Sequence, residues 1–97
     1  MSESIIKRTR KGICFCCGRV CPTECHHIFR GKNRKRADAD GLVVHLCHWC
    51  HNEPPSGVHY NKTRDLTLKK LGQMTWMKHY NKTVDDFITA YGRNYIE

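Results

Sequence analysis

Two Cys-x2-Cys pairs, Cys14 with Cys17 and Cys47 with Cys50, constrain the fold of this chain more than any other feature. Two thiolates at this spacing reach one ion from a tight turn, and two such pairs complete a tetrahedral zinc site. Disulfides are disfavoured because the seven cysteines are an odd number and the N-terminal sequence has no secretory signal. Buried reduced thiols without a metal are the alternative. We therefore expect a structural Zn2+ ion on these four cysteines.

Three further cysteines, Cys16, Cys21 and Cys25, are left over from this pattern. Cys16 competes with Cys17 as a ligand, but the Gly18 that follows Cys17 suits the turn of the first pair better. We therefore assign Cys17 to the zinc site and leave the roles of the other three cysteines open.

The chain is short and strongly basic, with 97 residues, 39% hydrophobic residues and a net charge of +8. Ordering each residue costs about 1.5 kcal/mol, and so small a core offsets little more than that. Zinc binding in small domains contributes about 10–16 kcal/mol, so a zinc site would make up the difference. No apolar run approaches the roughly 20 residues of a membrane span, and we expect no membrane association.

Histidines gather around the second cysteine pair. An isolated histidine is more often a core or surface residue than a ligand, but six of the seven histidines lie within one 34-residue stretch. These six are His26, His27, His45, His48, His51 and His59. Their density predicts a second metal site or a catalytic centre beside the cysteines.

We expect one domain at residues 12–97, preceded by a flexible basic arm at residues 1–11. Loose alternation predicts a short strand at residues 23–29, and an apolar β-branched run predicts a second strand at residues 41–46. Between them, residues 30–36 carry five cations in seven positions, and we expect a basic loop there.

The last third of the chain has a helical pattern. Apolar residues at every third position predict a helix from about Asp65 to Tyr80, in which Gly72 is a weak point. Thr83 begins a capping-box pattern, which predicts a second, shorter helix that ends at Gly92.

Three stretches of the sequence carry a resemblance to a known family: Cys-His-His-Ile-Phe at 25–29, the segment 41–51 with its Cys-x2-Cys-His, and Gly-Arg-Asn-Tyr at 92–95. Together they resemble the HNH endonucleases, the His-Me finger or ββα-metal nucleases, and within them the small phage and prophage proteins. The resemblance covers about residues 14–95. It implies an α+β fold, a small zinc-stabilised ββα-metal domain, treble-clef-like, with C-terminal helices.

The resemblance also implies roles for individual residues. In the family, the first histidine of the adjacent pair binds a catalytic ion and the second is the general base, which implies His26 and His27 respectively. His51, which closes the second cysteine pair, is implied as a metal ligand, and His59 would complete the set. Two asparagines are alternatives for that last place, Asn52 and Asn61. The catalytic divalent ion would be Mg2+, Mn2+, Ni2+ or Zn2+, separate from the structural zinc.

The residue that supports the base departs from the family pattern. Leu42 falls where the family has its central Asn, and Asn33 or His45 is the candidate replacement. The division of labour itself has a physical basis, because neighbouring residues of a strand point to opposite faces. His26 can therefore face a metal while a neutral His27 faces an attacking water, which suits general-base catalysis at cellular pH.

The basic segment after the histidine pair is suited to holding phosphates, since Lys and Arg next to a polyanion release its counterions. A solvated basic loop is the alternative. The five cations that we expect to contact DNA are Arg30, Lys32, Arg34, Lys35 and Arg36.

We therefore expect a metal-dependent HNH endonuclease that nicks or cuts DNA, leaving a 5′-phosphate and a 3′-hydroxyl as the resemblance implies. A catalytically inactive, zinc-stabilised nucleic-acid-binding module is the alternative. The expected partner is DNA, together with a second copy of the chain or a phage or host recombination or packaging protein. The expected location is the host-cell cytoplasm.

Overall fold

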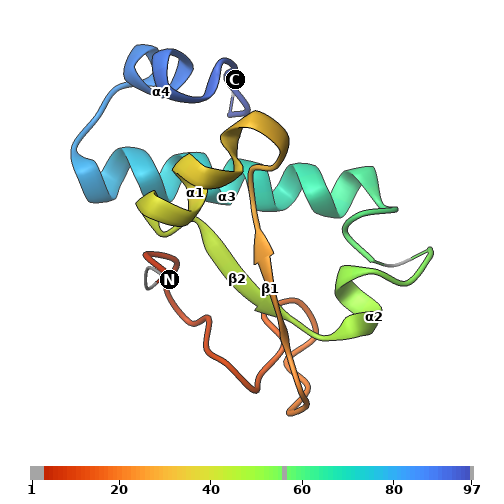
Figure 1. Ribbon diagram of the computed structural model, residues 1–97. Helices are drawn as coiled ribbons and strands as arrows, with labels where there is room; N and C mark the ends of the chain where they lie inside the picture. Colours follow the sequence, from red (N-terminus) through yellow and green to blue (C-terminus); the bar gives the residue numbers. More distant parts are fainter. Residues whose placement is uncertain (1–3, 56, 97) are drawn as a thin grey trace.

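The structure is a computed structural model that describes residues 4–55 and 57–96. It is a small α+β fold in which a two-stranded sheet is followed by a long helix (Figure 1). The elements in chain order are β1 (Glu24–His27), the 3-10 helix η1 (Gly31–Asn33), α1 (Arg34–Asp40), β2 (Val43–Leu46), α2 (His48–His51), α3 (Lys62–Tyr80) and α4 (Val84–Tyr91).

The two strands form an antiparallel pair in which His26 lies opposite Val44 and His27 lies opposite Val43. Both strands are shorter than the sequence predicts. β1 ends at His27 because the next two residues, Ile28 and Phe29, turn into the core and are almost fully buried. This ending releases the chain for the turn into η1.

The basic segment 30–36 is not the loop that we expected. It contains η1 and the first turn of α1, and α1 ends at Gly41, which adopts the left-handed conformation with φ +79°. The helix forms because its Arg, Lys and Ala residues favour helix and because Ala37 is fully buried against the domain. Four of the five cations, Lys32, Arg34, Lys35 and Arg36, therefore extend from these helices, whereas Arg30 directly precedes η1.

The N-terminal segment also differs from expectation. We expected a flexible arm at residues 1–11, of which residues 1–3 lie outside the described residues. In the part that is described, Ile6 is buried, the backbone N–H of Ile5 donates to Gly41 O at 2.9 Å, and the hydroxyl of Ser4 donates to Val43 O. Burial of these isoleucines holds the segment against the domain despite its flanking cations.

Helix α3 begins earlier than predicted, at Lys62, because the side chain of Asn61 caps it by accepting from the N–H of Arg64 at 3.1 Å. Gly72 is not a weak point but a place of close approach. A Cβ atom there would lie 3.1 Å from Ile28 Cγ2 and 3.2 Å from Phe29 Cε2. Without a side chain, α3 can cross the end of β1 at short range.

The capping box predicted before α4 is confirmed. The Thr83 hydroxyl accepts from the N–H of Asp86 at 3.2 Å, and the Asp86 carboxylate accepts from the N–H of Thr83 at 2.9 Å. The helix ends before Gly92, as predicted. Its Phe87 packs against Phe29 and Trp76, with ring centroids 5.5 Å and 5.4 Å apart, which ties α4 to the core beside the sheet.

Candidate metal centres and active site

The four cysteines of the two Cys-x2-Cys pairs lie together. Cys14 and Cys17 precede β1, whereas Cys47 is the N-cap residue of α2 and Cys50 lies within it. The four sulfur atoms all lie within 4.8 Å of one another. The Sγ atoms of Cys17 and Cys47 are 3.9 Å apart. Tetrahedral zinc with Zn–S bonds of about 2.3 Å sets its sulfurs about 3.8 Å apart. The group therefore has the dimensions to hold a metal ion.

Backbone donors around Cys14 favour the thiolate that a metal requires. Burial alone would raise the pKa of Cys14, but backbone N–H groups of Cys47, Cys17 and Cys16 outweigh it and lower the pKa to about 6. The N–H of Cys17 lies 3.4 Å from the Cys14 sulfur. Cys16 lies outside the group and is exposed, which agrees with the assignment of Cys17 as the ligand.

Three histidines form a second group, separate from the cysteines. His26 comes from β1, His51 is the last residue of α2, and His59 lies in the loop before α3, and one ring nitrogen of each lies within 4.8 Å of the others. The Nε2 atoms of His51 and His59 are 2.9 Å apart. Three ring nitrogens converging on one point form a donor set of the kind that binds divalent transition metals.

His26 is the histidine whose surroundings most favour a metal. Its side chain is 1% exposed, and its Nε2 atom has no hydrogen-bond partner among the described residues. Burial, followed by repulsion from His51 and His59, lowers the pKa of His26 to about 3. The ring is therefore neutral at pH 7, and a bound ion would satisfy a buried nitrogen that is otherwise unpaired.

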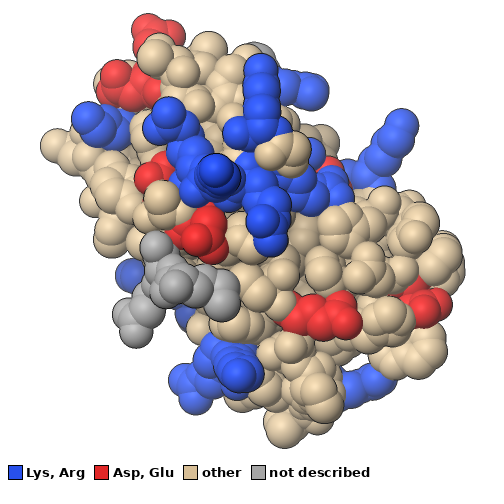
Figure 2. Space-filling view, in the orientation of Figure 1, with Lys and Arg blue, Asp and Glu red and all other residues tan. Residues whose placement is uncertain are grey.

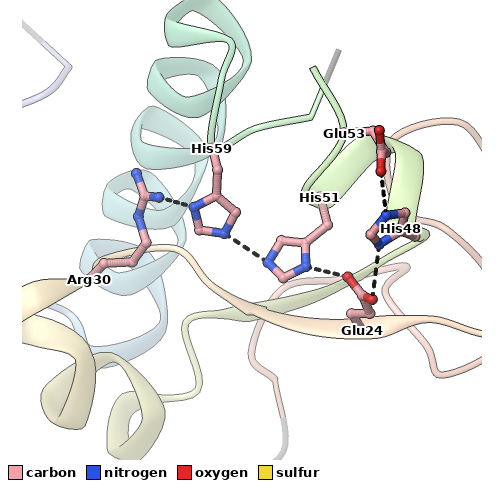
Figure 3. Close-up of polar contacts among 6 residues, drawn as sticks. All are labelled: Glu24, Arg30, His48, His51, Glu53 and His59. Carbon is pink, nitrogen blue, oxygen red and sulfur yellow. Dashed lines mark hydrogen bonds and ion pairs between the residues drawn. The ribbon is translucent and has the colours of Figure 1, made fainter. Parts of the chain in front are cut away.

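Glu24 orients the second histidine of this group (Figure 3). Its Oε1 atom lies 2.7 Å from Nδ1 of His51, and this hydrogen bond is the main reason that the pKa of Glu24 is lowered. Because a carboxylate only accepts, Nδ1 of His51 donates and Nε2 is left with its lone pair toward His59. The other carboxylate oxygen lies 3.4 Å from Nδ1 of His48, which also contacts Glu53.

Glu24 was not among the residues selected from the sequence. The signal that would have found it is the strand period of two, which puts Glu24 and His26 on the same face of β1.

Arg30 reaches the group from the turn after β1. Its guanidinium contacts Nδ1 of His59 (Figure 3). It also donates to Asp65 Oδ1 at 3.2 Å. Burial and the charge of Arg30 lower the pKa of His59. Arg30, one of the five cations predicted to contact DNA, therefore lies against His59, a predicted metal ligand.

His27 points to Asp38 and is not part of the three-histidine group. Its Nε2 atom lies 3.0 Å from Asp38 Oδ1, which extends from α1. The expected substitute Asn33 instead donates to the Tyr91 carbonyl at 3.0 Å, and Leu42 is fully buried. The residue that contacts His27 is therefore Asp38, whereas Asn33 and His45 were the candidates from the sequence.

One cavity of about 210 Å3 connects these groups. Its lining is Cys25, His26, His27, Arg30, Arg34, His51 and His59. Of the five predicted DNA-contacting cations, Arg30 and Arg34 line this cavity, and Lys32, Lys35 and Arg36 are exposed on η1 and α1 nearby. Lys and Arg side chains gather on this face of the molecule over η1 and α1 (Figure 2).

Comparison of the chain with protein-family models, with curated proteins and with solved structures finds no match to any of them. In the described residues, no helix has both the length and the apolar character needed to cross a membrane. The side chains around the cavity are therefore the basis for assigning a function.

Proposed function

We propose that this protein is a metal-dependent endonuclease of the HNH type that hydrolyses phosphodiester bonds in DNA. The observation that supports it is the cavity lined by the three-histidine group, by His27 and by two arginines, with Asp38 contacting His27 from outside the lining. A metal site, a general base and phosphate-binding cations are the parts that such a reaction needs. Action as a homodimer or beside phage recombination or packaging proteins, in the host cytoplasm, belongs to the same proposal.

The metal ligands in this proposal are His26, His51 and His59. Three imidazoles favour Ni2+ or Zn2+ over Mg2+, because the hard Mg2+ ion prefers oxygen ligands. When bound, the ion supplies Lewis-acid stabilisation of charge on the phosphate and on the departing 3′-oxygen. Glu24 keeps His51 in the tautomer whose Nε2 lone pair is available.

His27 is the general base in this proposal. With Nε2 donating to Asp38, the Nδ1 atom carries the lone pair and can take the proton of an attacking water. The Asp38 carboxylate then stabilises the imidazolium that forms, and it also keeps the ring from rotating. The contact thus serves both the orientation and the charge of the base.

The arginines hold the substrate. Arg30 and Arg34 line the cavity, where a scissile phosphate has to lie, and a guanidinium can donate two parallel hydrogen bonds to phosphate oxygens. The exposed Lys32, Lys35 and Arg36 would contact neighbouring phosphates and release counterions. Such contacts position the duplex and carry little sequence information.

The four-cysteine group has a structural role in this proposal, with zinc as its ion. Cys47 and Cys50 belong to the same short segment as His51, so an ion on the cysteines anchors the turn that carries a catalytic ligand. A helix of four residues has little stability of its own and needs such an anchor.

A supercoiled-plasmid assay tests the proposal. Wild-type protein and His27→Ala are compared in EDTA and in added Mg2+, Mn2+ or Ni2+, with His79→Ala, near the end of α3, as the control. We expect metal-dependent nicking that His27→Ala lowers by about 10²–10⁴-fold, with DNA binding intact. Equal cleavage by wild type and His27→Ala would contradict the assignment of the base. Salt-sensitive DNA binding without cleavage would favour the inactive nucleic-acid-binding module.

A further inference from the structure

A second, larger cavity of about 550 Å3 lies between the N-terminal segment and α3. Its lining is Ile5, Ile6, Lys7, Arg8, Phe15, Leu71, Thr75, Lys78 and His79. None of these residues lines the histidine cavity, so the two cavities are built from different parts of the chain. The volume lies within the range of about 300–1,000 Å3 in which proteins bind ligands.

The lining of this cavity combines an apolar part with cations. Ile6 is buried, and Phe15 and Leu71 are half-buried hydrophobic residues that pack against the core. Lys7 and Lys78 are exposed, and neither forms an ion pair within the described part of the chain. Among the described residues, no Asp or Glu belongs to the lining, so the cations there have no acidic neighbour in the described wall of the cavity.

We propose that this cavity docks a short acidic segment of a partner protein, with one large apolar side chain inserted among Ile6, Phe15 and Leu71. Carboxylates on either side of that anchor would face Lys7, Arg8 and Lys78. An aromatic anchor in a pocket is the usual energetic centre of a protein interface, and complementary charge at the rim adds specificity and association rate.

The same features disfavour DNA as the occupant. A duplex presents phosphates to a protein surface and has no protruding apolar group, so it could use the cations but would leave Phe15 and Leu71 in contact with water. The inference stands apart from the proposed nuclease activity, because it uses none of the residues assigned to the histidine cavity.

The test uses three fluorescein-labelled pentapeptides and the zinc-loaded full chain. The first has a central phenylalanine flanked by four aspartates, the second has alanine in place of the phenylalanine, and the third has lysines in place of the aspartates. We expect the first peptide to bind most tightly and to shift the amide NMR signals of Leu71 and Thr75. Its affinity should fall when NaCl is added. Failure of the first peptide to bind would overturn the proposal, as would equal binding of the alanine peptide.

Matched variants on α3 separate this cavity from general attraction to a basic protein. Lys78→Glu changes the cavity, and Lys70→Glu makes the same charge change at an exposed position of the same helix outside it. Lys78→Glu should lower the affinity for the acidic peptide by about tenfold, whereas Lys70→Glu should change that affinity far less. Equal effects of the two variants would overturn the proposal.

Two further measurements complete the test. Thr75→Tyr places a bulky side chain in the cavity without removing a core side chain and should weaken peptide binding while plasmid nicking is unchanged. A short DNA duplex is titrated against the same amide signals. If the duplex shifts Leu71 and Thr75 and Lys78→Glu weakens DNA binding instead, the cavity belongs to the nucleic-acid surface and the peptide proposal is wrong.

Discussion

Asp38 and His27 are eleven residues apart in the chain, and the contact between Asp38 Oδ1 and His27 Nε2, 3.0 Å long, joins α1 to the end of β1. The side chain of Asp38 is 37% exposed whereas that of His27 is 11% exposed, so the ring is the more buried partner of the contact. Because the carboxylate accepts, the contact determines the tautomer of the proposed base and leaves Nδ1 as its acceptor nitrogen.

Asp38→Ala should lower the nicking rate by about 10–100-fold, because the ring of His27 loses the group that orients it. Asp38→Asn should retain part of the activity, since its amide oxygen still accepts from the neutral ring but cannot stabilise the imidazolium. Single-turnover nicking gives the rate, and fluorescence anisotropy with labelled duplex gives the affinity, which should stay constant. A loss of DNA affinity equal to the loss of rate would argue for a binding role of Asp38.

Glu24→Ala should weaken binding of Ni2+ or Mn2+ at the histidine group by about 10–100-fold, because His51 loses its orienting acceptor. Glu53→Ala is the matched control. It also removes a carboxylate near the histidines, but Glu53 contacts His48, at 2.8 Å, and not His51. Isothermal titration on zinc-loaded protein gives both affinities. If Glu53→Ala has the same effect, general charge rather than the Glu24–His51 contact sets the affinity.

Cys47→Ser should abolish metal binding at the four-cysteine group and with it cooperative folding. Zinc binding of about 10–16 kcal/mol is comparable to or larger than the 5–15 kcal/mol that usually stabilises a whole domain. Cys16→Ser is the control, because Cys16 is an exposed thiol outside the group. Elemental zinc content and thermal unfolding followed by circular dichroism distinguish the variants. A Cys47→Ser protein that keeps its zinc and its melting transition would contradict the assignment.

Asp40→Ala should destabilise the packing of α3 and α4 on α1. The Asp40 carboxylate accepts from Trp76 Nε1 at 3.0 Å and from the Tyr91 hydroxyl at 2.7 Å, and both aromatic residues are buried. Two buried donors left without an acceptor should lower the free energy of unfolding by about 2–4 kcal/mol. Urea denaturation measures this loss. Asp40→Asn keeps an acceptor and should lose less; an equal loss would mean that the charge, not the hydrogen bonds, is what matters.

Local patterns predicted those features whose partners lie within a turn of one another. The capping box joins Thr83 to a residue three positions away, and the end of α4 at Gly92 follows from the conformational freedom of glycine. The basic segment 30–36 was misread as a loop because its charges obscured its helix propensity, and the burial of Ala37 that stabilises α1 is a tertiary effect.

The sequence by itself determined the two Cys-x2-Cys pairs, the grouping of histidines around the second pair and the helical end of the chain, because residue spacing specifies which side chains can share one turn. Only the tertiary structure decided that His59, eight residues beyond His51 and across two prolines, faces it at 2.9 Å. It also decided that Asp38 rather than Asn33 supports His27 and that Glu24 holds His51. Such partners depend on the path of the chain between them, which packing of the core sets and spacing does not.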